Sequence, residues 1–175
     1  GMEKILILGY GKEGKATKKY LKKYYPKIKI NIADEKLGKN YLSKQHDFDI
    51  AVKTPGINKE LVKIPYTTAT NIFFSKIKGK CKIIGITGSK GKSTTSSLIY
   101  EILKNSGKKV EFLGNIGNPM LGSLFKNNYL PRDSYYVLEL SSYQLDDIKF
   151  SPDISVVTAL FPEHMDYHGG LKNYY

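Results

Sequence analysis

Apolar residues in this chain gather into short runs, and glycine-containing turns follow several of them. The runs at 4–8, 83–86 and 135–140 are nearly continuous, as is typical of strands buried on both faces of a parallel sheet. Between such runs, apolar residues recur at helical spacing, for example over 92–103. Further strands are predicted at 28–32, 48–52, 109–113 and 153–160. The pattern therefore predicts an α/β fold.

The strand–turn–helix rhythm occurs in two successive parts of the chain. We predict a Rossmann-like parallel-sheet domain over residues 1–78 and part of a P-loop ATPase domain over residues 79–175. The polar stretch 76–80 contains glycine and suits a boundary between them. The length of 175 residues is sufficient for two small domains.

The motif Gly88-Ser89-Lys90-Gly91-Lys92-Ser93-Thr94 joins a predicted buried strand to a predicted helix. Glycine frees backbone N–H groups to surround phosphates, lysine neutralises them, and the Ser93 hydroxyl suits Mg²⁺. A standard P-loop would have glycine where this chain has Ile86, so only the shorter core of the motif matches. A lysine- and serine-rich turn without a ligand is the structural alternative. We predict a triphosphate site.

A second glycine motif, Gly9-Tyr10-Gly11-Lys12-Glu13-Gly14, follows the first strand, and Asp34 comes at the end of the second. This spacing is typical of a dinucleotide site, with the acid placed for a ribose hydroxyl. The turn Thr54-Pro55-Gly56 follows the third strand. Ligands of open α/β sheets bind at the carboxyl ends of the strands, so we expect these three segments to converge. A purely structural glycine turn is the alternative.

Glu139 and the histidines are the other candidates for chemistry. Glu139 lies near the carboxyl end of an apolar strand, where a carboxylate is unfavourable unless it is paired or binds a metal. In P-loop proteins such an acid is the usual Mg²⁺ partner, and a structural ion pair is the alternative. His164 follows the last predicted strand between Glu163 and Asp166, and by residue type alone it is a solvated loop residue or a ligand.

Composition narrows the functional classes. The net charge is +12, but Arg132 is the only arginine, whereas proteins that read nucleic-acid sequence rely on arginine. Nucleic-acid binding is therefore not expected. Apolar runs are far shorter than the roughly 20 residues of a membrane span, and we expect neither a membrane segment nor a signal peptide. The single cysteine, Cys81, suits a cytoplasmic location.

Four motifs in order resemble the Mur ligases, the ATP-dependent amide-forming enzymes of peptidoglycan synthesis. They are the loop at 88–94, Gly114-Asn115-Ile116-Gly117, the run Leu138–Leu145 and Glu163-His164-Met165-Asp166. Isoleucine at position 86 is normal in this family. The N-terminal glycine unit and the Thr54 turn are most similar to the branch that adds D-glutamate to UDP-N-acetylmuramoyl-L-alanine. The resemblance covers essentially the whole chain.

The resemblance implies a role for each matching position. The N-terminal unit would bind the UDP-sugar rather than a nicotinamide cofactor, and Asn115 would contact the muramoyl group. Lys92 and His164 would be catalytic, and Mg²⁺ would be held by Ser93, Glu139 and His164. ATP would contact Gly88, Ser89, Lys90, Gly91, Lys92, Ser93, Thr94 and Thr95. The UDP-sugar would contact Gly11, Lys12, Glu13, Gly14, Asp34, Thr54, Pro55 and Gly56.

The implied reaction has two steps. The substrate carboxylate attacks the γ-phosphate of ATP to give an acyl phosphate and ADP, and the amine of D-glutamate then displaces phosphate. The carbamylated lysine and the C-terminal domain of the family would lie beyond Tyr175, so we expect an inactive, monomeric, cytoplasmic fragment. Glu13 departs from the family, which more often has a small hydroxyl residue there. Another amide ligase of the superfamily and a non-catalytic nucleotide-binding module are the alternatives.

Overall fold

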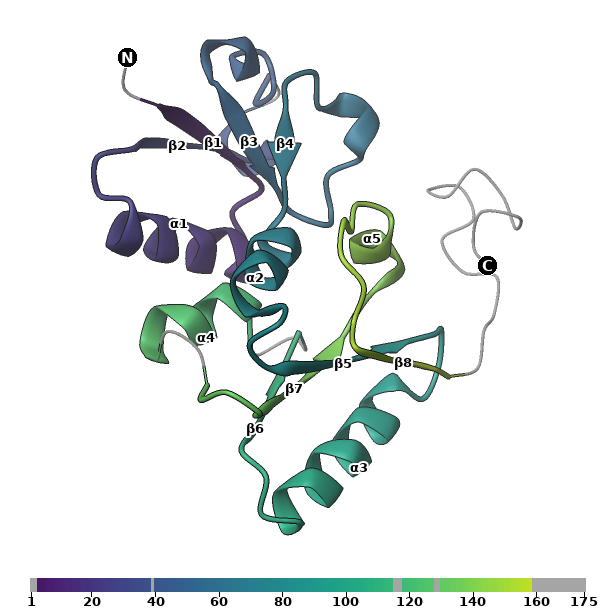
Figure 1. The fold of residues 1–175 in the computed structure, drawn as a ribbon. Coiled ribbons are helices and arrows are strands. Elements are labelled where there is room, and N and C mark those ends of the chain that lie inside the picture. Colours follow the sequence, from purple (N-terminus) through teal and green to yellow (C-terminus); the bar gives the residue numbers. More distant parts are fainter. Residues whose placement is uncertain (1–2, 39, 115–117, 128–129, 159–175) are drawn as a thin grey trace.

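The computed structural model describes residues 3–38, 40–114, 118–127 and 130–158. Two four-stranded parallel sheets lie one above the other, with a layer of helices between them (Figure 1). The predicted α/β class with parallel sheets is confirmed. In the part of the chain that the structure describes, every helix is too short or too polar to span a bilayer.

The first sheet has the strand order β2-β1-β3-β4. Its central strand β1 is buried on both faces, with Ile7 and Leu8 completely inaccessible, as a continuous apolar run predicts. The edge strand β2 alternates between exposed and half-buried positions instead. The strands are β1 (Lys4–Leu8), β2 (Lys29–Ala33), β3 (Ile50–Lys53) and β4 (Tyr66–Thr67), and 3-10 helices occupy Glu35–Leu37, Gln45–Asp47 and Lys59–Leu61.

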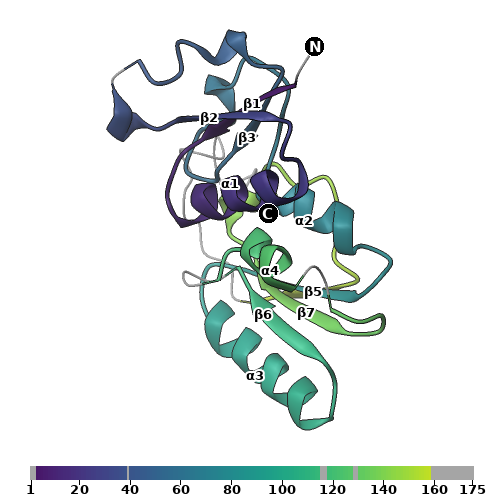
Figure 2. The ribbon, with the colours of Figure 1, turned by 90° about the vertical axis from the view of Figure 1, so that its left-hand side faces the viewer.

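Three helices form the layer between the sheets: α1 (Lys12–Tyr24), α2 (Ala69–Ile77) and α4 (Met120–Asn127). Figure 2 shows α1 and α4 side by side in this layer. One apolar cluster joins residues of both sheets to these helices, and the Phe73 ring of α2 meets the Tyr136 ring of β7 edge-on at 5.2 Å. The two sheets therefore share a hydrophobic core, while the domain division at residues 78 and 79 stays a prediction.

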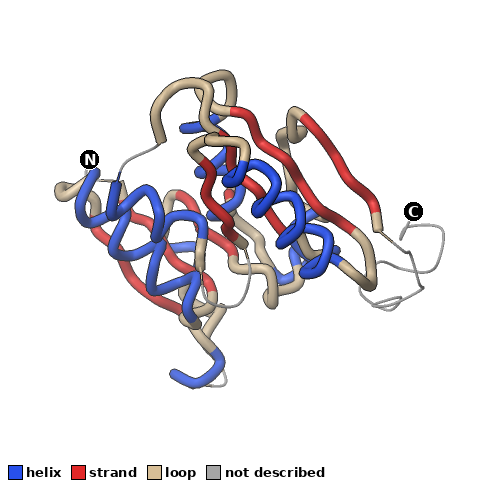
Figure 3. The backbone as a smooth tube through the Cα atoms, turned by 90° about the horizontal axis from the view of Figure 1, so that it is seen from below, coloured by secondary structure: helices blue, strands red, loops and turns tan. Residues whose placement is uncertain are grey.

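The second sheet has the order β6-β7-β5-β8, and α3 covers its far face. Seen from below, α3 crosses in front of these strands (Figure 3). Ile99 and Leu103 of α3 pack on Ile84, Ile86 and Val137 of the sheet. The elements are β5 (Lys82–Thr87), α3 (Lys92–Asn105), β6 (Val110–Leu113), β7 (Tyr135–Glu139), the short helix α5 (Ser142–Leu145) and β8 (Ile154–Val157).

Candidate functional site

The loop after β5 leaves the backbone donors at the start of α3 without a side-chain cap. Gly91 precedes the helix in a left-handed conformation, with φ of +82°, and has no side chain with which to cap it. The first N–H groups of a helix have no acceptors within the helix, and the helix dipole adds positive potential there. A phosphate group fits such a helix start.

Gly88 is where the loop passes closest to the end of β8. Its φ of +127° is rare for other residues, and a Cβ atom there would lie 3.1 Å from backbone atoms of Thr158 and against its hydroxyl. Thr158 in turn donates its N–H and its hydroxyl to the carbonyl of Thr87, at 2.9 and 3.0 Å. The path of the loop is therefore fixed by its neighbour strand, and it needs glycine.

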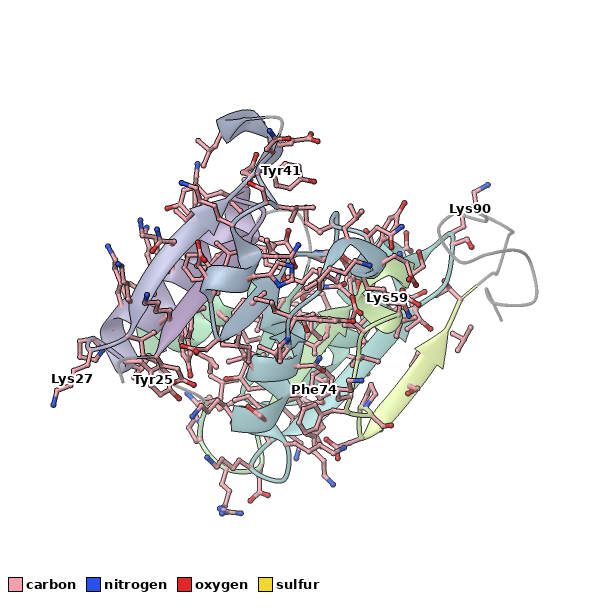
Figure 4. The ribbon with its side chains drawn as sticks, turned by 90° about the horizontal axis from the view of Figure 1, so that it is seen from above. Tyr25, Lys27, Tyr41, Lys59, Phe74 and Lys90 are labelled. Carbon is pink, nitrogen blue, oxygen red and sulfur yellow. The ribbon has the colours of Figure 1, made fainter. Side chains whose placement is uncertain are left out.

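The predicted ATP-contact residues at 88–95 all lie in this loop and the first turn of α3. Ser93 and Thr94 are exposed, whereas Lys92 is half-buried. Lys90 projects outward at the edge of the molecule (Figure 4). Two accessible hydroxyls and one partly covered ammonium therefore surround the uncapped helix start.

Glu139 ends β7 beside the first turns of α3. Its strand pairs with β5 so that Ile86 and Glu139 are opposite each other, and only 8% of Glu139 is exposed. The hydroxyl of Ser96 lies 3.1 Å from Glu139 Oε1 and 2.7 Å from the carbonyl of Lys92. A hydroxyl has one hydrogen, so Ser96 donates to one of these acceptors at a time. The carboxylate is thus held against the helix that carries Lys92 and Ser93.

The donor set around Glu139 fits Mg²⁺. Among the described residues, no lysine or arginine forms an ion pair with this buried carboxylate, so its charge calls for another cation. Groups of three His, Cys, Asp or Glu side chains do not occur in the described ranges. Mg²⁺ does not require one, because it binds one or two carboxylate or hydroxyl oxygens together with waters and substrate phosphates. Ser93 and Glu139 would supply such oxygens.

The N-terminal glycine loop is packed as tightly as the P-loop. Gly9 has φ of +93°, and a Cβ atom there would meet the Thr54 side chain. A Cβ atom on Gly14 would lie 3.1 Å from the carbonyl carbon of Gly9 and closer to its oxygen. Gly11 precedes α1 without a side-chain cap. This loop also leaves a helix start open to an anion.

Asp34 builds this loop. Its carboxylate accepts the N–H of Tyr10 at 2.6 Å and that of Lys36 at 2.9 Å. These two backbone hydrogen bonds, Lys36 first and then Tyr10, lower the pKa of Asp34 below its ordinary value. The acid predicted to contact the nucleotide therefore also holds the glycine loop in shape, and each oxygen keeps a further lone pair for a ligand.

The Thr54 turn lies against the same strand end. Thr54 donates its N–H and its hydroxyl to the carbonyl of Leu8, at 3.0 and 2.7 Å. The structure thus brings the glycine loop, Asp34 and the Thr54 turn together at the carboxyl edge of the first sheet. The convergence of these segments that the sequence predicts is therefore found, and direct hydrogen bonds hold Asp34 to the glycine loop and Thr54 to the end of β1.

Glu13 points into the protein from the first turn of α1. Burial raises the pKa of its carboxyl group to about 7, and the nearby ammonium of Lys53 partly opposes this rise. At this position, where the family more often has a small hydroxyl residue, the chain therefore carries a half-buried carboxyl group whose pKa lies near physiological pH. Its predicted contact with the UDP-sugar stays a prediction.

A cavity of about 360 Å³ opens between α1 and α4. Lys12, Lys15 and Lys19 line its α1 side, and Asn118 lies opposite. The motif that begins at Gly114 approaches this region, since Gly114 donates its N–H to the carbonyl of Asn118 at 3.0 Å. A Cβ atom on Gly114 would lie 2.5 Å from the backbone oxygen of Glu139. The cavity is therefore cationic on one side and close to Glu139.

Two predicted site residues, Asn115 and His164, lie outside the described residues. The structure adds three polar residues that sequence reasoning did not identify: Ser96 beside Glu139, and the buried pair Lys53 and Asp147. Ser96 could have been found from its place one turn after Lys92 on the buried face of α3. Lys53 gave a signal as well, because it ends an apolar strand immediately before the Thr54 turn.

Comparison with known proteins gives consistent matches. The sequence profile of the Mur ligase middle domain matches residues 86–175. A UDP-N-acetylmuramoyl-L-alanine–L-glutamate ligase from Salinispora tropica is 44% identical over 135 residues, which is 73% of this chain and 28% of that protein. A UDP-N-acetylmuramoylalanine–D-glutamate ligase from Clostridium botulinum is 40% identical over 145 residues, which is 79% of this chain and 31% of the relative.

A third relative extends the similarity along almost the whole chain. The UDP-N-acetylmuramoyl-L-alanine–L-glutamate ligase from a Micromonospora strain is 34% identical over 198 aligned positions, covering 98% of this chain and 42% of its own length. The chain thus spans between 28 and 42% of the length of these curated relatives.

Proposed function

The chain belongs to the Mur ligase family, and on this premise we propose that it forms the nucleotide-sugar and ATP sites of a peptidoglycan-precursor ligase. The proposed enzyme adds D-glutamate to UDP-N-acetylmuramoyl-L-alanine through an acyl phosphate, with release of ADP and phosphate. Because the chain spans only part of its relatives, the complete reaction is proposed for the enzyme that contains these sites.

The placement of Glu139 carries the proposal. Among the described residues, no ammonium group pairs with this buried carboxylate, which lies against the first turns of α3, where an uncapped helix start, Lys92 and two exposed hydroxyls meet. This combination suits a nucleotide triphosphate with its Mg²⁺. A second uncapped helix start, at Gly11, belongs to the same molecule and suits the diphosphate of a UDP-sugar.

In the first proposed step, the substrate carboxylate attacks the γ-phosphorus of ATP, the bond to the β–γ bridging oxygen breaks, and ADP leaves. Both reactants are anions, so neutralisation of charge is the main requirement. The N–H groups at the start of α3 and the ammonium of Lys92 would bind the β- and γ-phosphates. Mg²⁺ held by Ser93 and Glu139 would supply further positive charge.

In the second proposed step, the amine of D-glutamate attacks the acyl phosphate, the carbon–oxygen bond to phosphate breaks, and an amide forms. The residues of this chain would contribute by holding the acyl phosphate in position. A role of His164 at a second Mg²⁺, the muramoyl contact of Asn115, a cytoplasmic location and a monomeric state all remain predictions from the sequence.

L-Glutamate is the second candidate amino acid. The relatives from Salinispora tropica and Micromonospora are named as L-glutamate ligases, whereas the Clostridium botulinum relative is named as a D-glutamate ligase. Both groups match more than two thirds of this chain. A ligation assay must therefore offer D-glutamate and L-glutamate separately. The enantiomer with which the enzyme releases ADP in the presence of UDP-N-acetylmuramoyl-L-alanine decides between the two candidates.

Calorimetric titration of the chain tests the binding part of the proposal. We expect UDP-N-acetylmuramoyl-L-alanine to bind, ATP to bind only weakly without Mg²⁺, and NADH not to bind. Binding of NADH without the UDP-sugar would overturn the assignment of the first sheet. Nucleotide binding without ADP release from the full-length enzyme would instead favour the non-catalytic module, and release with a different acceptor would favour another ligase of the superfamily.

A further inference from the structure

Lys53 ends β3 with its side chain completely buried. Its Nζ atom lies 2.8 Å from Asp147 Oδ2, 2.7 Å from the carbonyl oxygen of Ile57 and 3.2 Å from that of Thr54. Three acceptors match the three N–H bonds of an ammonium group. The buried cation is therefore paired and fully hydrogen-bonded.

The two carbonyls that Lys53 binds belong to the turn over residues 54–57. Inside this turn, Ile57 donates its N–H to the carbonyl of Thr54 at 3.1 Å. Thr54 is also fixed to β1 through the carbonyl of Leu8. One ammonium thus bridges the first and last carbonyls of the turn and sets how tightly it closes.

Asp147 lies on the segment between α5 and β8, in the part of the chain that forms the second sheet. Its second carboxylate oxygen accepts the hydroxyl of Tyr66 at 2.7 Å, and its backbone carbonyl accepts the Asn71 amide at 2.9 Å. Asn71 also accepts the N–H of Lys149 at 2.8 Å. The segment is therefore fastened to β4 and α2 by buried polar contacts.

A short segment of the chain, which contains α5, connects Glu139 with Asp147. After Glu139 ends β7, Ser141 caps α5 in a capping box with Gln144, and Asp147 follows directly after that helix turn. Lys53 therefore connects the turn predicted to bind the nucleotide-sugar with the strand that carries the proposed Mg²⁺ ligand.

Stability alone is a poor explanation for this pair. Replacing a buried ion pair by apolar side chains of similar volume is often neutral or stabilising, so a core gains little from such a pair. An apolar side chain could fill the space of Lys53, but it could not bind the carbonyls of Thr54 and Ile57. Holding those two carbonyls is what requires an ammonium group.

We propose that Lys53 is a positioning residue, which shapes the 54–57 turn for the nucleotide-sugar and, through Asp147, fixes it relative to Glu139. The inference rests on the proposed function, because it assigns the nucleotide-sugar to this turn. Lys53 does not touch the substrate in this proposal and acts through the turn.

The test uses the double variant K53M/D147N, which removes both buried charges together and keeps an acceptor for Tyr66. The matched control is K59M. It removes the half-exposed ion pair of Lys59 with Asp146, 3.2 Å long, from the same interface without touching the turn carbonyls. Lys59 lies near the middle of the view in Figure 4. Hydrogen exchange at Ile57 and calorimetric titration with UDP-N-acetylmuramoyl-L-alanine and with ADP·Mg²⁺ are the measurements.

In a folded K53M/D147N chain, we expect the Ile57 amide to exchange about tenfold faster or more, because the turn opens locally. We expect the Kd for UDP-N-acetylmuramoyl-L-alanine to rise about tenfold while the Kd for ADP stays within about twofold. K59M should change neither quantity. If the double variant does not fold, the unchanged chain supplies a second measurement: UDP-N-acetylmuramoyl-L-alanine should slow exchange of the Ile57 amide more than ADP·Mg²⁺ does at the same saturation.

Each contrary result overturns a different statement. Unchanged exchange at Ile57 and unchanged affinity in the folded double variant would overturn the inference. Parallel loss of affinity for both ligands in the double variant, or equal slowing of Ile57 exchange by both ligands in the unchanged chain, would also overturn it, because either would mark a general structural role. Failure of the unchanged chain to bind UDP-N-acetylmuramoyl-L-alanine would overturn the proposed function itself.

Discussion

The hydroxyl of Ser96 lies 3.1 Å from Oε1 of Glu139, so the acid that ends β7 is bound to the helix that follows the P-loop. Ser96 is completely buried, and its hydroxyl also reaches the carbonyl of Lys92. A small hydroxyl at this one position thus connects the helix proposed to bind phosphate with the proposed metal ligand.

Replacing Ser96 by alanine should weaken this relation without unfolding the protein. Loss of one buried hydrogen bond should lower the free energy of unfolding by about 1 kcal/mol. We expect Mg²⁺-dependent ADP binding, measured by calorimetry, to weaken several-fold. S106A is the control, because Ser106 directly follows α3 and its hydroxyl makes the same kind of bond, to the carbonyl of Ile102 at 2.8 Å, on an exposed surface. Equal effects of the two substitutions on ADP binding would contradict the role of Ser96.

Replacing Glu139 by glutamine should act in opposite directions with and without the metal. Without Mg²⁺, removal of a buried charge that has no ammonium partner in the described part of the chain should leave the thermal midpoint unchanged or raise it. With saturating ADP·Mg²⁺, the unchanged chain should gain more than the variant, because at one ligand concentration a tighter-binding ligand stabilises the native state more. E101Q, on the exposed side of α3, serves as the control. A larger ligand-induced rise in E139Q would refute the metal assignment.

Two glycines in first helical turns should respond to alanine with opposite signs. A Cβ atom on Gly14 would collide with the carbonyl of Gly9, whereas one on Gly122 would meet nothing within 4 Å. We expect G14A to lose about 1–3 kcal/mol of stability through this overlap. G122A should gain up to about 1 kcal/mol, because alanine favours the helix over glycine. Urea denaturation measures both, and stabilisation by G14A would contradict the packing described for the glycine loop.

The carboxyl group of Glu13 should make stability fall as the pH rises. Its pKa is raised in the folded protein from 4.5 to about 7, so the folded state binds the proton more tightly than the unfolded state does. The stabilising contribution is complete below about pH 4.5 and is lost as the pH passes through about 7. E13Q should therefore be more stable than the unchanged chain at pH 8, by about 3 kcal/mol at most, and the difference should shrink toward pH 4.5.

Denaturation of E13Q across this pH range checks the sign of the effect. E60Q, at an exposed position of the 3-10 helix Lys59–Leu61, is the matched control for the removal of one carboxylate from the surface. A stability advantage of E13Q that grew as the pH fell would show that the Glu13 carboxylate is stabilised, rather than penalised, by its surroundings.

Much of the fold follows from local patterns in the sequence. The strands at 4–8, 82–87 and 135–139 are continuous apolar runs, and the helix at 92–105 has apolar residues at helical spacing. The α2 helix at 69–77 was not predicted, because β-branched and aromatic residues obscure its pattern and it is buried on most sides. Its signal was Thr68, whose hydroxyl accepts the N–H of Asn71 as an N-cap at 3.1 Å.

The candidate site, like the fold, could be predicted from the sequence only in part. The places of the glycine loops, Lys92 and Glu139 at the ends of buried strands could be predicted from local sequence signatures, whereas their binding roles stay predictions. The pairing of Lys53 with Asp147 could not be predicted. The two residues belong to the parts of the chain that form different sheets, and no local pattern relates them. Contacts of this kind depend on how the two sheets pack, which a single sequence does not indicate.

The helices between the sheets have a consequence for how the protein melts. Phe73, Phe74 and Ile77 of α2 are completely inaccessible, and they pack in one cluster with Ile83, Tyr136 and Leu138 of the second sheet. Neither sheet can lose its order without exposing that shared interior. We therefore expect the two glycine loops to belong to one cooperative unit, in which a ligand bound at either loop would slow the global opening of both.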